Sequence, residues 1–317
     1  MKVRLGYVAI SNKLGKKVTS SSTVTFSNYS KIISEEKKLE KLKAVILSNL
    51  NDLEKIIKYN IENKIHFYRI TSALIPLVTH PSVGYYGHKE IFKREFIHIG
   101  NLIKSSNMRV DIHPDQFNVL NSNNKEVVNN TIKNLNHQLS ILKSLEYKKG
   151  KMVLHIGGAT GGKDIALERF KETYKKLPGE IKDAIILEND DKIYTATETL
   201  KLCKEFNIPM VLDVHHHNCN NYNEDIIQLL DEIFSTWDND EFVPKIHFSS
   251  PLEGKKDRRH APYINAEDFK DFIYRAKEID RDFDVMLECK EKDMALYKLV
   301  DEIKDDFTFI DNSTFQC

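Results

Sequence analysis

The fold of this chain is decided by the stretch Asn207-Ile-Pro-Met-Val-Leu-Asp213-Val-His215-His216-His217. Turn residues open the stretch, an apolar run follows, and one carboxylate and three imidazoles end it. A short apolar run between turn residues is typical of a strand buried on both faces, as in a parallel sheet. A carboxylate at the end of such a strand needs a partner, because an uncompensated buried charge is very unfavourable. Asp and His together therefore indicate metal ligands.

Similar segments recur along the chain and alternate with helical patterns. Strands are expected at residues 3–8, 65–70, 108–112, 152–156, 184–188, 207–217, 243–248 and 283–287. Helices are expected at residues 34–62, 89–105, 125–145, 164–176, 195–206, 224–234, 266–279 and 292–304. This alternation predicts one α/β domain over residues 1–317, a (β/α)₈ TIM barrel. A doubly wound open sheet is the alternative, because periodicity alone does not show closure.

Charge and cysteine usage narrow the class of protein. Lys plus Arg and Asp plus Glu both total 47, so the net charge is zero, which argues against a simple polycation but not against a local basic surface. The four cysteines are scattered without a Cys-x-x-Cys pair, which suits a reducing compartment. No apolar run approaches the ~20 residues that a membrane span needs. We expect a cytoplasmic monomer without a membrane partner.

Histidines and carboxylates stand at the ends of most expected strands. Parallel strands of a barrel bring their carboxyl ends to one mouth, where active sites of this fold are built. The candidates there are Tyr7, His80, His113, His155, Glu188, Asp213, His216, Lys245, His247 and Glu288. Imidazole and carboxylate without thiolate suit Zn²⁺, Mn²⁺ or Fe²⁺ better than Ca²⁺ or Mg²⁺ alone. So many ligands predict two or three clustered ions that share bridging carboxylates.

Other histidines are given a structural interpretation. A single histidine at a strand end is more often a hydrogen-bonded structural residue than a ligand, so the prediction depends on the coincidence at six successive strand ends. Alternation along a strand cannot point three consecutive imidazoles inward, so one or both of His215 and His217 are interpreted as packing or supporting residues. The remaining histidines lie at strand starts or on helices and are interpreted as structural. They are His66, His88, His98 and His137.

Motifs in chain order from Leu5 to about Glu288 resemble the UV damage endonuclease family. They are Leu5-Gly6-Tyr7, Tyr68-Arg69-Ile70-Thr71-Ser72, Thr79-His80-Pro81, His113-Pro114-Asp115-Gln116-Phe117, Leu154-His155-Ile156-Gly157-Gly158, Leu187-Glu188-Asn189-Asp190, Asp213-x-x-His216, Pro244-Lys245-Ile246-His247-Phe248-Ser249-Ser250 and His260. The resemblance implies a TIM barrel related to endonuclease IV, with a trinuclear metal site. It also implies a nick on the 5′ side of a UV photoproduct, a cyclobutane pyrimidine dimer or a 6-4 photoproduct, that leaves a 3′-hydroxyl and a 5′-phosphate.

The resemblance also implies roles for single residues. One ion would be held by His113, His155 and Glu188, a second by Glu188, Asp213, His247 and Glu288, and a third by His216 and His260. His80 would lie near the scissile phosphate. Lys245 matches a lysine that is carboxylated in the family, so Glu188, Lys245 and His80 are the expected catalytic residues. Mn²⁺ is the expected metal, with Zn²⁺, Co²⁺ and Mg²⁺ as alternatives.

Contacts with double-stranded DNA carrying UV lesions are expected at the rim. Gln116 and Phe117 match the pair that probes the damaged duplex, and Tyr7 is expected to assist. Basic residues in two loops on the mouth side would contact phosphates despite the zero net charge. They are Lys13, Lys16 and Lys17 in the first loop and Lys255, Lys256, Arg258 and Arg259 before His260.

Two other classes of enzyme stay open at this point. An abasic-site endonuclease of the endonuclease IV type would use the same ions with different probing loops. A metal-dependent sugar isomerase or epimerase would also use a barrel with His, Glu and Asp at strand ends, and it would need a small closed pocket and no basic rim.

Overall fold

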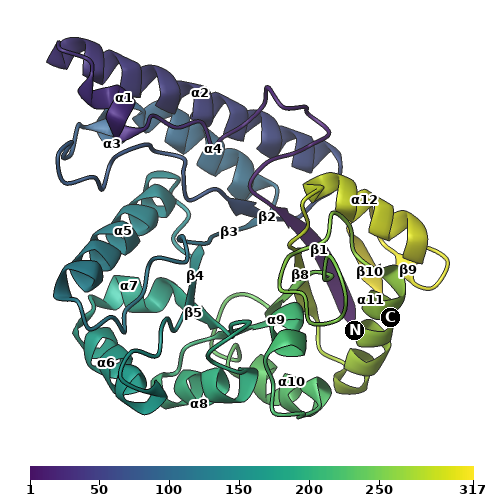
Figure 1. The fold of residues 1–317 in the computed structure, drawn as a ribbon. Helices are drawn as coiled ribbons and strands as arrows, with labels where there is room; N and C mark the ends of the chain where they lie inside the picture. The colour runs from purple at the N-terminus through teal and green to yellow at the C-terminus, as the bar shows by residue number, and fades with distance from the viewer.

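The protein, seen here in a computed structural model that describes residues 1–317, is a closed barrel (Figure 1). Parallel strands follow the order β2-β3-β4-β5-β6-β7-β8-β1, and β1 pairs with β2 to close the ring. The eight strands are β1 (Lys2–Val8), β2 (Phe67–Ile70), β3 (Arg109–Ile112), β4 (Lys151–His155), β5 (Ile185–Glu188), β6 (Met210–Asp213), β7 (Lys245–Phe248) and β8 (Phe283–Leu287). The predicted (β/α)₈ TIM barrel is confirmed, and the open sheet is wrong.

Helices surround this barrel (Figure 1). They are α1 (Phe26–Ser30), α2 (Glu35–Glu62), α3 (His88–Ile91), α4 (Lys93–Ser105), α5 (Lys125–Ser144), α6 (Lys163–Lys176), α7 (Gly179–Ala184), α8 (Ala196–Phe206), α9 (Val214–Cys219), α10 (Ile226–Ser235), α11 (Ala266–Ala276) and α12 (Lys292–Ile303). Several begin at a side chain that accepts a backbone N–H, such as Ser34 for α2 and Thr195 for α8. No helix has both the length and the apolar content that crossing a membrane requires.

Local structure departs from the predicted elements at several places. The helix predicted over residues 89–105 is two helices, because Phe92 leaves helical geometry at φ −107° and ψ 24°. The helix predicted over 266–279 ends at Ala276, and a 3₁₀ turn, η1 (Lys277–Ile279), follows. Helices α1 and α7 were not predicted, since helices of five and six residues show little periodicity.

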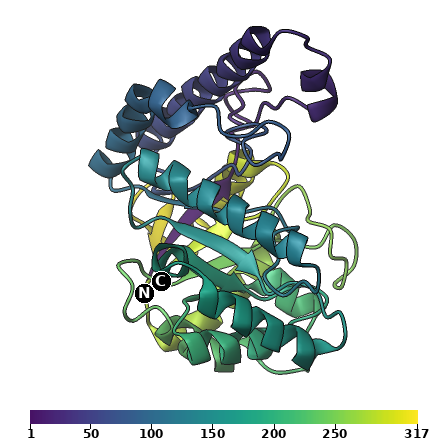
Figure 2. The ribbon, with the colours of Figure 1, turned by 90° about the vertical axis from the view of Figure 1, so that its left-hand side faces the viewer.

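A C-terminal hairpin of β9 (Thr308–Phe309) and β10 (Thr314–Gln316) completes the sheet. β1 pairs with β2 only through Gly6 to Val8, at its carboxyl end. The amino-terminal part of that edge of β1 is therefore not paired with β2. Strand β10 occupies this edge antiparallel, with Lys2 opposite Gln316. The N–H of Cys317 also donates to the carbonyl of Met1 at 3.1 Å, and the two ends of the chain lie side by side (Figures 1 and 2).

Alternation along the strands divides the core in two. The larger layer packs between strands and helices and includes Leu5 and Tyr7 of β1. Residues of opposite parity point into the barrel, where Val8 packs with Phe67 and Met286. Gly6 lies on this inner side too, and a Cβ there would be 2.5 Å from the carbonyl oxygen of Phe67. The close approach of β1 and β2 therefore requires glycine at this position.

Paired charges fill much of the remaining interior. Arg109 Nη1 donates to Asp284 Oδ2 at 2.8 Å, and Arg4 Nε donates to Asp284 Oδ1 at 2.6 Å. Lys245 Nζ donates to Asp111 Oδ2 at 2.7 Å. All except Arg4 are fully or almost fully buried, so each charge depends on its partner. The barrel interior is thus already ionic below the strand ends.

The packing of α4 on the end of α5 gives a stability prediction. A Cβ on Gly100 of α4 would be 1.8 Å from the carbonyl oxygen of Leu145, which is backbone and cannot turn aside. We expect Gly100→Ala to lower the free energy of unfolding by about 1–3 kcal/mol through overpacking. Gly179→Ala, at the first residue of α7 with no atom within 4 Å of its Cβ, is the matched control and should be neutral or slightly stabilising. Urea unfolding of both variants measures the difference, and equal stability would contradict the close packing.

Candidate metal centre

The strand ends bring together three groups of residues able to hold metal ions. Within each group the ligand atoms lie within 4.8 Å of one another. The groups are His113, His155 and Glu188; Glu188, Asp213 and His216; and Glu188, His247 and Glu288. Since Glu188 belongs to all three, the geometry is that of one cluster with a shared carboxylate. Residues in or directly after six successive strands, β3 to β8, supply it. Asp213 groups with His216 and not, as expected, with His247 and Glu288.

Glu188 divides its two oxygens between different imidazoles. Oε2 lies 3.2 Å from Nε2 of His113 and 3.6 Å from Nε2 of His155. Oε1 lies 2.9 Å from Nδ1 of His247 and 3.4 Å from Nδ1 of His216. The carboxylate is 1% exposed, so its charge is compensated by these groups and not by water.

Backbone carbonyls orient three of the histidines. When Nδ1–H of an imidazole donates to a carbonyl, Nε2 keeps a free lone pair, which is the form that a metal ligand needs. The pairs are His113 with the carbonyl of Pro114 at 2.9 Å, His216 with that of Asn189 at 3.0 Å, and His260 with that of Glu288 at 2.7 Å. His260 thus lies beside the cluster but outside its three groups, with its ring 6.4 Å from that of His216.

Asp213 both ends β6 and caps α9. Its Oδ1 accepts the backbone N–H of His216 at 2.7 Å, while its buried Oδ2 has no hydrogen-bond partner. The three consecutive histidines therefore lie on a helix and do not continue the strand, which corrects the predicted strand end. Helical spacing turns His216 toward Glu188 and leaves His215 and His217 buried elsewhere, with His215 against the His260 ring at 5.4 Å.

The pKa values show that the cluster is short of positive charge. Burial raises the pKa of Asp213 well above its usual range, and the carboxylates of Glu188 and Glu288 add to the rise, against the effect of His216. Burial acts in the same sense on Glu188, but the imidazoles of His247 and His155 outweigh it and hold its pKa well below the usual range. Carboxylates this close cannot all be ionised without added cations. An unpartnered, buried Asp213 oxygen among imidazoles fits divalent ions.

Arg69 of β2 is a member of this site to which the sequence analysis gave no role. Its Nη2 donates to Nε2 of His247 at 2.9 Å and to Oε1 of Glu288 at 2.5 Å. Arg69 has the same parity as Phe67, which also points into the barrel, and this alternation was the available signal. The guanidinium supplies one positive charge against the carboxylates of the cluster.

Two of the expected catalytic residues lie apart from the three groups. Lys245 is one layer deeper in the barrel, where its ammonium pairs with Asp111 and burial lowers its pKa to about 8. His80 stacks on Phe26 with ring centroids 4.0 Å apart, and its Nδ1 accepts the backbone N–H of Ser82. Neither residue belongs to a ligand group in this structure.

The expectation that Tyr7 contacts DNA is wrong in this structure. Its ring lies in the layer between strands and helices, and its hydroxyl donates to Oδ1 of Asn60 on α2 at 2.7 Å. The residue follows Gly6, which points inward, so alternation sends its side chain outward. A fully buried side chain on this side of the strand has no surface for a nucleic acid.

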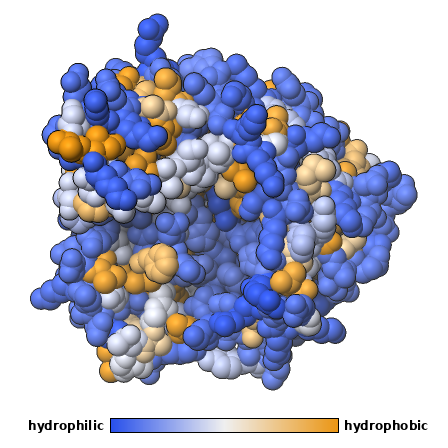
Figure 3. Space-filling view, turned by 45° about the horizontal axis from the view of Figure 1, so that its top comes forward, coloured by the Kyte–Doolittle hydropathy of each residue, from blue (hydrophilic) through white to orange (hydrophobic).

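The other expected DNA contacts do lie on the surface. Gln116 and Phe117 are exposed in the loop after β3, and Phe117 is 79% exposed. Lys255 and Lys256 are exposed and lie in no ion pair, whereas Arg259 pairs with Asp257 and Glu253, and Arg258 with Asp191. The basic rim is therefore weaker than its composition suggested. The face seen in Figure 3 is hollowed at its centre, and the hollow is mostly hydrophilic.

Comparisons with known proteins agree with this geometry. A UV DNA damage endonuclease of Bacillus cereus (strain B4264) is 40% identical over 304 residues, 96% of this chain and 95% of that protein. The crystal structure of SacUVDE is 33% identical, with a TM-score of 0.85 over 96% of this chain and 98% of that one. Endonuclease IV from Thermus thermophilus, 18% identical, has a TM-score of 0.50 over 74% of this chain and 87% of that one, which shows a shared fold alone.

The family model described as UV-endonuclease UvdE matches residues 3–315, a span that contains every strand-end ligand of the cluster. With this match, and with relatives of this identity and coverage, the chain belongs to the UV-endonuclease UvdE family.

Proposed function

We propose that this protein is a metal-dependent DNA repair endonuclease that nicks the backbone immediately 5′ to UV photoproducts. The products would be a 3′-hydroxyl and a 5′-phosphate, and the lesions would include cyclobutane pyrimidine dimers and 6-4 photoproducts. The observation that carries the proposal is the place of Glu188 in all three ligand groups, within a chain of this family. We propose that the enzyme acts as a monomer.

The donor set supports three divalent ions, with Mn²⁺ proposed and Zn²⁺, Co²⁺ or Mg²⁺ as alternatives. The proposed ligands are His113, His155, Glu188, Asp213, His216, His247, His260 and Glu288. Mixed imidazole and carboxylate ligands suit these metals. When bound, such ions would act as Lewis acids toward the phosphodiester and lower the pKa of the attacking water.

The chain's own residues hold this arrangement and balance its charge. Glu188 would bridge through its two oxygens, and Asp213 would use the oxygen that its helix cap leaves free. Arg69 would hold Glu288 in place. Carboxylation of Lys245, which family likeness suggests, needs the neutral amine, and the pKa of about 8 makes a larger fraction of it neutral than in an ordinary lysine. It would also require the ion pair with Asp111 to open, because a carboxylated side chain is an anion.

Lesion recognition is proposed for the loop after β3. An exposed aromatic such as Phe117 can stack on an unpaired base, and Gln116 beside it can hydrogen-bond a base edge. Lys255 and Lys256, which have no carboxylate partner, would contact phosphates. His80 is proposed as a phosphate neighbour at the mouth, although it lies outside the ligand groups.

A nicking assay on labelled duplexes tests the proposal. The purified protein would be incubated with Mn²⁺ and a duplex carrying a defined pyrimidine dimer, an abasic site or no lesion. We expect a nick just 5′ of the dimer that disappears with chelator. Cleavage at the abasic site alone would favour an enzyme of the endonuclease IV type, and no cleavage of any duplex would overturn the proposal.

Removing the charge of the shared carboxylate gives the second prediction. Glu188→Gln keeps the shape of the side chain but weakens every ligand group, so kcat/KM for dimer nicking should fall at least about 100-fold. The fold should persist, as judged by circular dichroism. Glu172→Gln, on the exposed face of α6, is the control and should leave nicking unchanged. Full activity in Glu188→Gln would remove the bridging role.

Gln116→Ala tests the proposed probe of the duplex. Loss of one hydrogen bond to a base should lower the ratio of kcat/KM for damaged over intact duplex by up to about tenfold. Gln228→Ala, at an exposed position of α10, is the control for a glutamine outside this loop. An unchanged ratio in Gln116→Ala would remove Gln116 from lesion recognition.

The titration of His216 predicts how stability depends on pH without metal. Burial acts to lower the pKa of His216, but the carboxylates of Asp213, Glu188 and Glu288 outweigh it and raise the pKa to about 9. Protonated His216 therefore stabilises the folded protein. Its contribution to the free energy of unfolding is complete below the pKa of the unfolded state, near 6.5, and is lost as the pH rises through the folded-state pKa of about 9. Between these values the free energy of unfolding should fall by up to about 1.4 kcal/mol per pH unit. Thermal unfolding of chelated protein between pH 6.5 and 9 measures this. His216→Gln should flatten the profile, and an unchanged profile would assign the slope to another group.

A further inference from the structure

A second hollow, the flank hollow, lies between the segment from Val78 to Lys89 and helix α5. Its volume is about 430 Å³. Its lining includes Lys89, Lys133, His88 and His137, and no Asp or Glu is among the lining residues. A wall with two ammonium groups, imidazoles and no carboxylate is electropositive.

Two buried histidines of this wall have ring nitrogens without hydrogen-bond partners. His88 is 1% exposed, and neither of its ring nitrogens has a partner. His137 is 8% exposed, its Nε2 has no partner, and its ring centroid lies 5.8 Å from that of His88. Buried polar groups in native proteins are normally paired, and an unpaired one is unfavourable by about 1–3 kcal/mol. A purely structural role for His88 and His137, as interpreted from the sequence, does not explain why these ring nitrogens are buried without partners.

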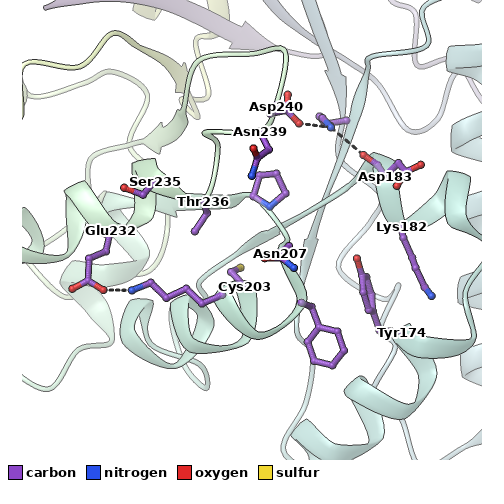
Figure 4. A pocket seen from close by; sticks show the side chains of 14 residues that line it. Tyr174, Lys182, Asp183, Cys203, Asn207, Glu232, Ser235, Thr236, Asn239 and Asp240 are labelled. Atoms are coloured by element: carbon purple, nitrogen blue, oxygen red, sulfur yellow. Dashed lines mark hydrogen bonds and ion pairs between the residues drawn. The ribbon is translucent and has the colours of Figure 1, made fainter.

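The two lysines of the flank hollow also lack partners of opposite charge. Neither Lys89 nor Lys133 lies in an ion pair, and Lys89 Nζ lies 5.4 Å from the centroid of the Tyr85 ring. The contrast is a larger hollow of about 810 Å³ at the amino-terminal ends of β4 and β6 (Figure 4). There Lys151 pairs with Asp240 and Lys204 pairs with Glu232, so two of its three lysines have carboxylate partners, and the third, Lys182, donates to the carbonyl of Lys175.

We propose that the flank hollow binds a phosphate group, which in the working enzyme belongs to the backbone of the bound DNA. Lysine ammonium groups and imidazole N–H groups are donors that suit a phosphate oxygen. A metal ion fits poorly, because the lysines would repel it and no third ligand completes a group here. This inference rests on the proposed function for the identity of the phosphate, but not for its binding.

The position of the flank hollow supports DNA as the source. Asn134, next to Lys133 on α5, donates to Oδ1 of Asn118 at 2.8 Å, and Asn118 follows Gln116 and Phe117 in the same loop. His80, from the loop after β2 at the mouth, lines the hollow as well. A duplex probed by Phe117 would thus have its backbone near this flank.

The salt dependence of DNA binding tests the proposal in the full-length protein. Each phosphate contact adds about 0.9 to the slope of log Kd against log salt concentration. The double variant Lys89→Gln/Lys133→Gln removes one phosphate contact and should therefore reduce this slope by about 1 for damaged and intact duplex alike. The matched control removes two unpaired exposed lysines elsewhere, Lys148→Gln/Lys201→Gln, and should keep the wild-type slope.

A second measurement separates the possible sources of the phosphate. Inorganic phosphate is titrated into protein labelled with ¹³C at histidine, in Mg²⁺ buffer, and the ring signals of His88 and His137 are followed by NMR. We expect both signals to shift in the wild type and in the control variant, but not in Lys89→Gln/Lys133→Gln. Neither measurement requires nicking, so failure of the proposed function would not be mistaken for failure of this one.

The two measurements together distinguish the possible ligands of the flank hollow. Shifts with a reduced salt slope support a site for the DNA backbone. Shifts with an unchanged slope overturn the DNA assignment and leave a site for a free phosphorylated molecule. No shift of either signal overturns the phosphate site, and shifts with Zn²⁺ but not with phosphate would make the hollow a metal site.

Discussion

The carboxylate of Glu188 has to be compensated inside the protein, and the mouth of the barrel is arranged around that requirement. Imidazoles from β3, β4, β7 and α9 face its two oxygens. Burial raises the pKa of the neighbouring Asp213, and the carboxylates of Glu188 and Glu288 add to the rise. Its Oδ2 is buried without a hydrogen-bond partner. One shared anion thus accounts both for the convergence of six strands and for the affinity for cations that the site should have.

Much of this arrangement could be predicted from the sequence, because it depends on local rules. Strand alternation and the common direction of parallel strands place His113, His155, Glu188 and His247 at one mouth without any knowledge of distances. The same rules would have placed Arg69 inside and Tyr7 outside, since Gly6 and Phe67 mark the inward positions of their strands. The expected role of Tyr7 followed from the family resemblance, which does not contain the parity of the strand.

Other features depend on partners that are distant in the chain, and no local pattern contains them. Lys245 faces the interior as alternation requires, but its pairing with Asp111 follows from the packing of β7 against β3 across the barrel. The neutralisation of Arg258 by Asp191 likewise joins two separate loops. The helical turn at His215 to His217 was hidden as well, because Asp213 is both the last residue of a strand and a helix cap.

The pairing of β1 with β8 and β10 has a consequence for how the chain reaches its native state. The first strand meets Phe283 to Leu287 on one edge and Thr314 to Gln316 on the other, so the ring closes between segments from opposite ends of the sequence. Contacts between residues so far apart in the sequence form slowly, because the entropy of closing the long intervening chain is lost before the contacts stabilise the fold. Until then the edge of β1 that meets β8, the start of its other edge that meets β10, and the facing edge of β8 present unpaired backbone groups. Any partly folded chain in which these two ends have not yet met exposes strand edges that can pair with another chain.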